Sequence, residues 1–417
     1  MSSLCIAIIG AGPAGCTLAR LLLNASINCI IYEGETSLST RTQGGSLDIH
    51  PPTGQKALKE CGLWDEFQKW ARYDGEALKV MDKNMVAYIK APGTSADSSR
   101  GRPEIDRPKL RQILVESLPK GVIRWGKRVK SVEQDKKDGT YDVHFVNGSK
   151  DHGFDFVVGA DGAWSKVRPL LSDAVPYYAG IGGFDSLIPN AEKEHPDIHG
   201  LVERGSIFSF SDGKSLTLQQ RGDGNITCSC WTLRRENWMQ ESDFDIHDPV
   251  AVKKYLTHEY ADWKHPLGKG PLVTDDSLMM TRNLYILPIG HRWEGRKGVT
   301  LIGDAAHLCS PFAGEGVNIA MQDALLLAHA IMDGLKAGDW SKGIRAFELD
   351  MFKRATPIQA LSQRQLEMMF MTPGAPRSTI HAWVRNALGG PYFDSWWFKL
   401  LLPQWVVWVL LKAFFRW

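Results

Sequence analysis

The sequence predicts an α/β protein in which a parallel-sheet domain carries an inserted antiparallel sheet and is followed by a long C-terminal helix. Three observations support this prediction. The sequence contains three apolar runs, and each leads into a glycine or an acidic residue. Such runs are typical of strands that are buried on both faces. Period-2 patterning lies between the second run and the third, and a helical pattern follows the third run. With 417 residues, the chain is long enough for two packed domains.

Composition excludes several classes of function. Hydrophobic residues make up 43% of the chain and charged residues 23%, which is typical of a globular enzyme. A formal net charge of +2 without a basic tract gives no field for nucleic acid, so that class of partner is not expected. The seven cysteines are scattered without a CxxC pair, which indicates a cytoplasmic protein with no cysteine-bound metal. Cys228 and Cys230 alternate along a predicted strand, so we expect both to be buried on one face.

The first apolar run, residues 4–9, leads into a glycine-rich turn and a helix. The glycines have GxGxxG spacing, and they are Gly10, Gly12 and Gly15. Such a turn brings backbone N–H groups of the helix start, near Ala14, against a pyrophosphate. A second apolar strand then ends at Glu33, where an acid accepts hydrogen bonds from a ribose. The pattern predicts one bound dinucleotide with an unphosphorylated ribose, and a purely structural glycine turn is the alternative.

Two later motifs indicate which dinucleotide is bound. The second apolar run ends in "GADG", which supplies Asp161 and is followed by Arg168, and the third ends in "GDAAH", which supplies Asp304. The carboxyl ends of parallel strands meet at one edge of a sheet, so these side chains should lie together. Binding of a nicotinamide dinucleotide does not require the third motif, whereas the ribityl hydroxyls of FAD need a hydrogen-bond acceptor such as Asp304. The sequence therefore predicts FAD.

The segment "PFAGEGVN" follows the third motif and predicts a turn that enters a helix. The proline fixes the backbone, the glycines allow close approach, and the helix start directs its positive end across the turn, at Pro311, Gly314, Gly316, Val317 and Asn318. A reduced flavin carries negative charge at its pyrimidine end, so this helix start would stabilise it. An ordinary helix start on the protein surface is the alternative. His307 is expected to be structural rather than catalytic.

In this order and spacing, the three motifs resemble those of the group A flavoprotein monooxygenases, the family of aromatic hydroxylases. The likeness covers roughly residues 4–370, and residues 40–64, 103–118 and 161–168 are similar to the tetracycline-inactivating members. The resemblance implies a tightly held FAD, and NADPH, with NADH as the alternative, as a transient reductant. It also implies a C4a-hydroperoxyflavin that transfers one atom of O2 to an electron-rich carbon of the substrate.

The resemblance also assigns residues. It places Arg41 with Gly44 and Gly45 near the flavin ring, and Arg111 at the ribityl chain or pyrophosphate, for which a solvated arginine is the alternative. Asp161 and Arg168 would belong to an edge shared by the flavin and NADPH. The residues expected nearest the reacting part of the ring are Arg41, Pro311 and Gly314. Glu315 stands where the tetracycline-inactivating members have glutamine. If its carboxylate points at the flavin, it opposes the stabilisation of negative charge there.

The period-2 stretch within residues 174–277 predicts an antiparallel sheet that covers the flavin, and residues 76–93 should add a hairpin to it. Polar and aromatic side chains of this sheet are candidates for contact with substrate, and they are Gln219, Arg221, Trp231 and Arg234. For each of them, an outward-facing or core position is the alternative.

The predicted domain organisation is discontinuous. An FAD-binding domain comprises residues 1–75, 100–173 and 278–345, and a substrate domain comprises 76–99 and 174–277. A helical region, 346–390, should extend a helix that runs from about Trp340 to Met371 with a kink at Pro357. The tail, 391–417, is rich in tryptophan with flanking lysine and arginine, which is typical of peripheral contact with a membrane. Packing on the substrate opening and a dimer contact are the alternatives, and a monomer is expected.

These observations predict an FAD-dependent, NAD(P)H-consuming monooxygenase that hydroxylates or epoxidises an aromatic or polycyclic small molecule, such as a secondary metabolite. A flavin oxidase or reductase on the same fold is one alternative. A non-catalytic flavin-bearing protein that binds a hydrophobic ligand is another.

Overall fold

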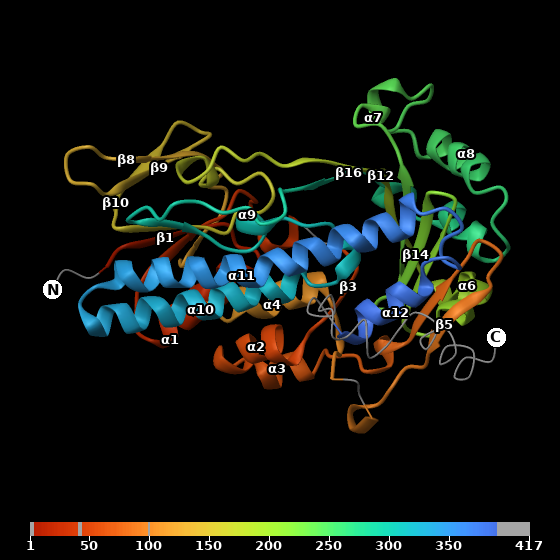
Figure 1. The fold of residues 1–417 in the computed structure, drawn as a ribbon, viewed down its shortest axis with the longest axis horizontal. Coiled ribbons are helices and arrows are strands. Elements are labelled where there is room, and N and C mark those ends of the chain that lie inside the picture. The colour runs from red at the N-terminus through yellow and green to blue at the C-terminus, as the bar shows by residue number, and fades with distance from the viewer. Residues whose placement is uncertain (1–3, 41–43, 99–100, 390–417) are drawn as a thin grey trace.

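The structure is a computed structural model that describes residues 4–40, 44–98 and 101–389. Arg41 and the tail, 391–417, were assigned roles above and lie outside the described residues. The two largest sheets of the described chain lie side by side, and a long helix passes from one to the other (Figure 1). No helix within the described ranges combines the length and the apolar character that crossing a bilayer requires.

The first sheet is parallel, which confirms the prediction from the apolar runs. Its five strands lie in the order β17 (Val299–Leu301), β11 (Phe156–Gly159), β1 (Ile6–Ile9), β2 (Cys29–Tyr32) and β7 (Ile123–Arg124). The register pairs Ile9 with both Gly159 and Tyr32, and Gly159 with Leu301. All the motif-bearing strands therefore end at the same level, and the residues that follow them meet at one edge of the sheet.

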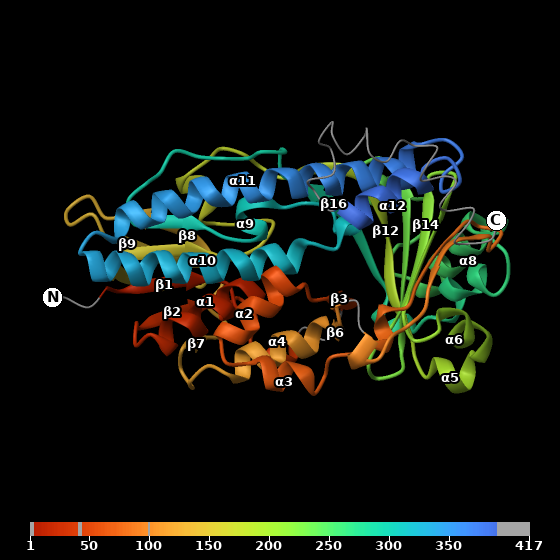
Figure 2. The same cartoon turned by 60° about the horizontal axis from the view of Figure 1, so that its bottom comes forward.

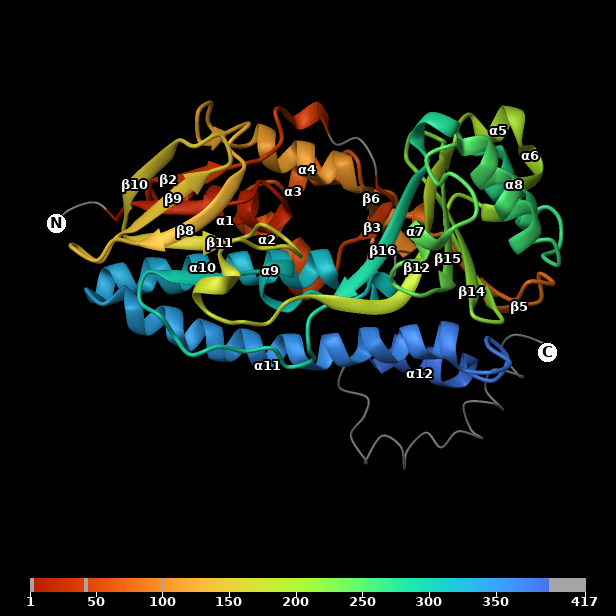
Figure 3. The same cartoon turned by 90° about the horizontal axis from the view of Figure 1, so that it is seen from above.

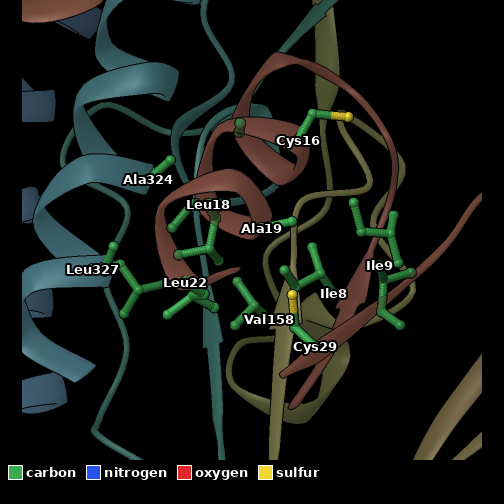
Figure 4. Packing of buried hydrophobic residues seen from close by; sticks show 14 of the residues in the cluster. Ile8, Ile9, Cys16, Leu18, Ala19, Leu22, Cys29, Val158, Ala324 and Leu327 are labelled. Carbon is green, nitrogen blue, oxygen red and sulfur yellow. The ribbon is translucent and has the colours of Figure 1, made fainter. Parts of the chain in front are cut away.

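Two helices that pack beside each other form the core of this domain with the strands. Helix α1 (Pro13–Asn24) follows β1, and α10 (Gly316–Ala337) packs beside it. Figure 4 shows Leu18 and Leu22 of α1 between the strand residue Val158 and Leu327 of α10. All four side chains are fully buried, and each contributes about 1.5–3 kcal/mol by leaving water. This packing fixes where the two helices begin relative to the strand ends.

The second sheet has seven strands, and residues 78–91 join it as a hairpin, as predicted. The order is β16 (Met280–Ile286), β12 (Tyr177–Ile188), β15 (Ile226–Leu233), β14 (Lys214–Gln220), β13 (Ser206–Ser211), β4 (Leu78–Met81) and β5 (Ala87–Ala91). The expectation of a purely antiparallel sheet is wrong at one pair, because β13 and β4 run parallel. The long connection between these two strands permits that direction, whereas a tight hairpin would not.

The faces of the second sheet differ in what covers them. Helices α6 (Pro196–Val202) and α8 (Pro249–Glu259) cover one face, where Cys228 and Cys230 are buried as predicted. The opposite face carries Trp231 and is covered by the end of α11 (Trp340–Leu366) and the π-helical turn that continues it to Met371. The predicted helix from Trp340 to Met371 is thereby confirmed.

The remaining elements connect these layers, and Figures 2 and 3 show β3 and β6 between the two sheets. A three-stranded antiparallel sheet, which the sequence analysis missed, lies against the parallel sheet. Its strands are β8 (Val129–Gln134), β9 (Tyr141–Phe145) and β10 (Lys150–Phe154). The other elements are β3 (Ser46–Asp48), α2 (Lys56–Glu60), α3 (Trp64–Gln68), β6 (Glu104–Asp106), α4 (Arg107–Glu116), α5 (Ala191–Glu194), α7 (Trp238–Glu241), α9 (Asp304–His307) and α12 (Ile380–Gly389).

Candidate flavin site

The glycine-rich turn between β1 and α1 has two packed glycines and one open glycine. Gly10 adopts a φ of +106°, and a Cβ there would lie 2.4 Å from the carbonyl oxygen of Ala160. A Cβ on Gly15 would lie 2.1 Å from the carbonyl oxygen of Gly10. A Cβ on Gly12 would meet nothing within 4 Å, and no side chain caps the first turn of α1, where Ala14 lies. The turn therefore has the open approach and the backbone donors that a pyrophosphate requires.

Glu33 and Arg111 lie against this turn. The carboxylate of Glu33 accepts hydrogen bonds from the backbone nitrogen atoms of Ala11, at 2.8 Å, and Glu35, at 2.9 Å. Arg111 is buried, donates to the carbonyl oxygen of Ala11 at 3.3 Å and lies 2.7 Å from the carboxylate of Glu35. The alternative of a solvated Arg111 is wrong. Both side chains hold the turn in place at the end where a nucleotide would lie.

Two carboxylates stand at the neighbouring strand ends. One oxygen of Asp161 accepts from the backbone nitrogen of Lys166 at 2.6 Å, while the other is buried and has no hydrogen-bond partner among the described residues. Asp304 remains reachable by solvent, although the surrounding protein raises the pKa of its carboxyl through desolvation. Burial likewise raises the pKa of Asp161. The carboxylate oxygens of Asp161 and Asp304 are thus available to accept hydrogen bonds from the hydroxyl groups of a ribityl chain, so the residues present suit FAD.

Arg168 lies between two of the strand ends. Its guanidinium is buried and donates to the carbonyl oxygens of Ala163, at 2.7 Å, and Ala305, at 2.9 Å. These bonds tie the turn after β11 to the turn after β17. The place of Arg168 at an edge shared by FAD and NADPH stays a prediction, although these bonds already direct two nitrogen atoms of the guanidinium at protein carbonyls. Arg168 therefore positions the two strand ends relative to each other.

A buried ionic network holds the turn that bears Asp304. Asp323 of α10 accepts from His307 at 2.5 Å, from the backbone nitrogen of Gly303 at 3.1 Å and from Arg354 at 3.0 Å. Burial opposes the charge on both His307 and Asp323, but their attraction raises the pKa of the histidine and lowers that of the aspartate. His307 is thus enclosed within the protein, in the structural role that the sequence analysis favoured.

The segment from Pro311 forms the predicted turn. Residues 311–313 make one 3-10 turn, Gly314 adopts a φ of +69°, and α10 begins at Gly316 without a side-chain cap. A Cβ on Gly316 would meet nothing within 4 Å, so the helix start, including the backbone nitrogen of Val317, is open to approach. The turn therefore presents the positive end of α10 as expected.

The side chain of Asn318 faces the protein rather than a cofactor. Its oxygen accepts from the backbone nitrogen of His50 at 2.8 Å, and its nitrogen donates to the carbonyl of Asp48 at 2.9 Å. Only the backbone of Asn318 remains for the cofactor-binding role assigned above. Glu315 also faces β3, since its carboxylate lies 3.3 Å from Nδ1 of His50.

The strand β3 is approached closely where two glycines precede it. A Cβ on Gly44 would lie 2.8 Å from the side chain of Arg107, and one on Gly45 would lie 2.6 Å from the amide oxygen of Gln219. Gln219 therefore projects from the seven-stranded sheet toward the segment expected near the flavin ring. Trp231 lies on the same face, in a cluster that includes Phe312 of the turn.

The two arginines proposed for substrate contact are placed differently. Arg234 is a correction, because its guanidinium lies 2.7 Å from the carboxylate of Glu259 and over the ring of Trp238, at the helix-covered side of the sheet. Arg221 lies 3.2 Å from the carboxylate of Asp223, in the loop after β14. Nε of Arg221 also lies 3.9 Å from the carboxylate of Asp106, which pairs with Ser46 beside the Gly45 that Gln219 approaches, so only Arg234 lies away from that segment.

The sequence analysis missed a polar group on the flavin side of the sheet. Asp185 of β12 accepts a hydrogen bond from Ser229 at 2.5 Å and lies 3.2 Å from Nε of Arg282. Pairing of Asp185 with Ser229, two positions from Trp231, places all of them on the face opposite the cysteines. Burial raises the pKa of Asp185. Its signal in the sequence is an acid within the apolar strand "GGFDSLI".

Comparison with known proteins decides the family. Residues 3–342 match the family model described as "FAD binding domain". The chain belongs to this family of FAD-dependent monooxygenases. It is 30% identical over 373 residues to "Monooxygenase penA" of Penicillium thymicola, a match that covers 78% of this chain and 84% of the relative. This monooxygenase is therefore an FAD-dependent enzyme, and NAD(P)H is the reductant typical of the family.

Solved structures show the same fold. The structure of Klebsiella pneumoniae HpxO complexed with FAD and uric acid aligns with a TM-score of 0.74 at 20% identity, and the match covers 92% of each chain. The tetracycline destructase Tet(51) aligns with a TM-score of 0.66 at 19% identity, over 91% of this chain and 95% of that one. The monooxygenase thus has the fold of group A flavin hydroxylases, as the resemblance implied.

Substitution of the open and the packed glycine should have different effects. Gly12→Ala adds a methyl group to open space, so the stability of the flavin-free protein should be unchanged while FAD binds about tenfold or more weakly, a loss of about 1.4 kcal/mol or more. Gly15→Ala should also lower the free energy of unfolding by about 1–3 kcal/mol, because the added atom overlaps a carbonyl. Denaturant titration and FAD fluorescence titration measure both. Equal destabilisation by the two substitutions would contradict this assignment.

Loss of the buried ion pair should destabilise this monooxygenase. Asp323→Asn leaves His307 and Arg354 without their carboxylate, at a cost of about 3–5 kcal/mol in unfolding free energy. The effect should be largest near neutral pH and shrink in acid, because stability from a lowered aspartate pKa is lost as pH falls through that pKa. Urea denaturation of both proteins across pH gives the comparison. Asp350→Asn, which alters an exposed partner of Arg354, is the control and should cost less than about 1 kcal/mol.

Proposed function

We propose that this enzyme hydroxylates or epoxidises an aromatic or polycyclic small molecule, such as a secondary metabolite, held between FAD and the seven-stranded sheet. The observation that carries the proposal is the meeting of the three motifs at one edge of the parallel sheet, opposite a sheet face that bears aromatic and polar side chains. Bound FAD supplies the two-electron chemistry and the activation of O2, with electrons from NADPH or NADH. The tasks left to the chain are binding, orientation and exclusion of water.

The chain's own residues divide these tasks. The turn at Gly12 would bind the pyrophosphate, and Asp161 with Asp304 would accept from the ribityl hydroxyls. The open start of α10 at Gly316 would lie beside the pyrimidine end of the ring and favour negative charge there. The closely approached backbone at Gly45 would lie on the ring's other flank.

Two regions of the sheet face suit different parts of a substrate. Phe312 of the turn is only partly buried and would contact the ring system, while Phe210 and Trp231 pack behind it beneath the end of α11 and help to keep water from the site. A polar region formed by Asp185 with Ser229, and by Gln219, would orient substituents that donate or accept hydrogen bonds. This arrangement supports an apolar ring substrate with at least one hydrogen-bond donor. Uric acid in HpxO agrees with ring substrates in relatives of this fold.

The reaction class is tested by following oxygen. Purified enzyme with FAD, NADPH and a panel of phenolic, polyketide and indole compounds under labelled O2 should give a product that gains one labelled oxygen atom per NADPH consumed. Formation of hydrogen peroxide alone, or of a product without label, would identify an oxidase or reductase. An unchanged compound without NADPH consumption would identify a binding protein.

Neighbouring residues of β15 provide a matched test of the substrate face. Ser229→Ala removes a hydrogen bond to the Asp185 carboxylate, a contact of about 1.5–3 kcal/mol, so kcat/KM should fall about tenfold or more with FAD affinity unchanged. Cys228→Ala, one position away on the helix-covered face, should change kcat/KM less than about twofold, since its side chain lies in another cluster. Steady-state kinetics with a substrate from the panel measures both. Equal losses in the two variants would contradict the assignment of the face.

A further inference from the structure

Three ionisable side chains form a contact beneath the turn that enters α10. Nε2 of His50 lies 2.7 Å from the carboxylate of Asp48, and Nδ1 lies 3.3 Å from the carboxylate of Glu315. Asp48 ends β3, His50 follows it, and Glu315 stands between the glycines at 314 and 316. The imidazole therefore bridges β3 to the turn, with one carboxylate at each ring nitrogen.

The bridge is held rigidly and lies close to the turn. Only 7% of the His50 side chain and 17% of the Glu315 side chain are exposed. Asn318 accepts from the backbone of His50 and donates to the backbone of Asp48, and Thr53 donates to the same amide oxygen at 3.4 Å. A Cβ on Gly314 would lie 3.5 Å from the second oxygen of Asp48. The charges of the bridge thus stand directly against the backbone of the turn.

The surroundings determine which of these groups is charged. Burial alone would lower the pKa of His50, but its two carboxylate partners raise it to about 9. Glu104 of β6 lies near Asp48, and burial together with that negative charge raises the pKa of Glu104 to about 8, with Arg72 and Asp106 beyond it. Near pH 7, the imidazole of the bridge is therefore protonated and lies between two carboxylates.

We infer that His50 is a positioning residue that neutralises Glu315, so that the turn facing the FAD ring keeps the positive potential of the α10 start. The inference rests on the proposed placement of the ring at this turn. Without the imidazolium, the Glu315 carboxylate would place a negative charge where reduced FAD carries its own.

Charge counting makes the inference testable. The bridge carries a net charge of −1 in the wild type, −2 in His50→Gln, 0 in Glu315→Gln and −1 again in the double variant. Each unit of net charge should change the ratio of the affinities for reduced and oxidised FAD by about tenfold, which corresponds to about 30 mV for a two-electron couple. The midpoint potential of bound FAD should fall in His50→Gln, rise in Glu315→Gln and return to the wild-type value in the double variant.

A matched control lies on the same helix. His329 of α10 contacts Glu60 at 2.7 Å, far along the helix from its start. His329→Gln breaks a histidine–carboxylate contact as short as that of His50 with Asp48, but far from the helix start, so it should leave the potential of bound FAD unchanged. Titration with FAD before the redox measurement establishes that each variant binds the oxidised cofactor.

The pH dependence supplies a second readout. Because the pKa of His50 is raised, its contribution is complete below about pH 6.5 and is lost as pH rises through about 9. The wild-type potential should then approach that of His50→Gln. The double variant should lack this step while retaining any step from Glu104, so the difference between wild type and double variant isolates His50.

Several outcomes would overturn the inference. The first is a shift of the midpoint potential in the same direction in both single variants. The second is a double variant whose potential stays as low as that of His50→Gln, and the third is an unchanged potential in Glu315→Gln. If His50→Gln fails to fold, Glu315→Gln decides alone, because a purely structural bridge predicts no rise in its potential. Failure of the wild type and of His329→Gln to bind FAD would instead refute the proposed cofactor site.

Discussion

Parallel pairing of buried strands is the constraint on which the rest of this structure depends. Because β2, β1, β11 and β17 run in one direction and in matched register, Gly10, Glu33, Asp161 and Asp304 must meet at one edge, although the sequence separates them widely. The strands β1, β11 and β17 are buried on both faces, so a slip of one residue would misplace their packed side chains and separate these groups. The cofactor site thus follows from how the core packs.

Secondary contacts then fix each strand end. The buried Asp323 network holds the turn before Asp304, and Arg168 ties this turn to the one after β11. On the other side, the side chain of Asn318 joins the start of α10 to β3. Asp323, Arg168 and Asn318 act on the site by binding the backbone of its turns. This task requires charged or amide side chains that are buried beside those turns. A flavin placed among them would meet a site whose backbone is already ordered, so little of its binding free energy would be lost to ordering the protein.

The parts of this site that were predictable from sequence are those set by local spacing. The glycines, Glu33, Asp161 and Asp304 follow strand patterns directly, because a strand end and its next residue share a fixed geometry. Roles that depend on distant partners were not predictable. Arg168 meets Ala305 and His50 meets Glu315 only through the fold, and Arg234 is drawn to Glu259 on the helix-covered side. Asp185 was detectable as an acid in an apolar strand, but its direction required the register with β15.

The central claim is that three distant segments bind one FAD. The most direct measurement is a calorimetric and absorbance titration of the flavin-free chain with FAD, and separately with NADPH. We expect one FAD per chain, a perturbed visible spectrum, and no comparably tight site for NADPH. A chain that stays colourless and gives no saturable heat with FAD, while it remains folded, would contradict the account.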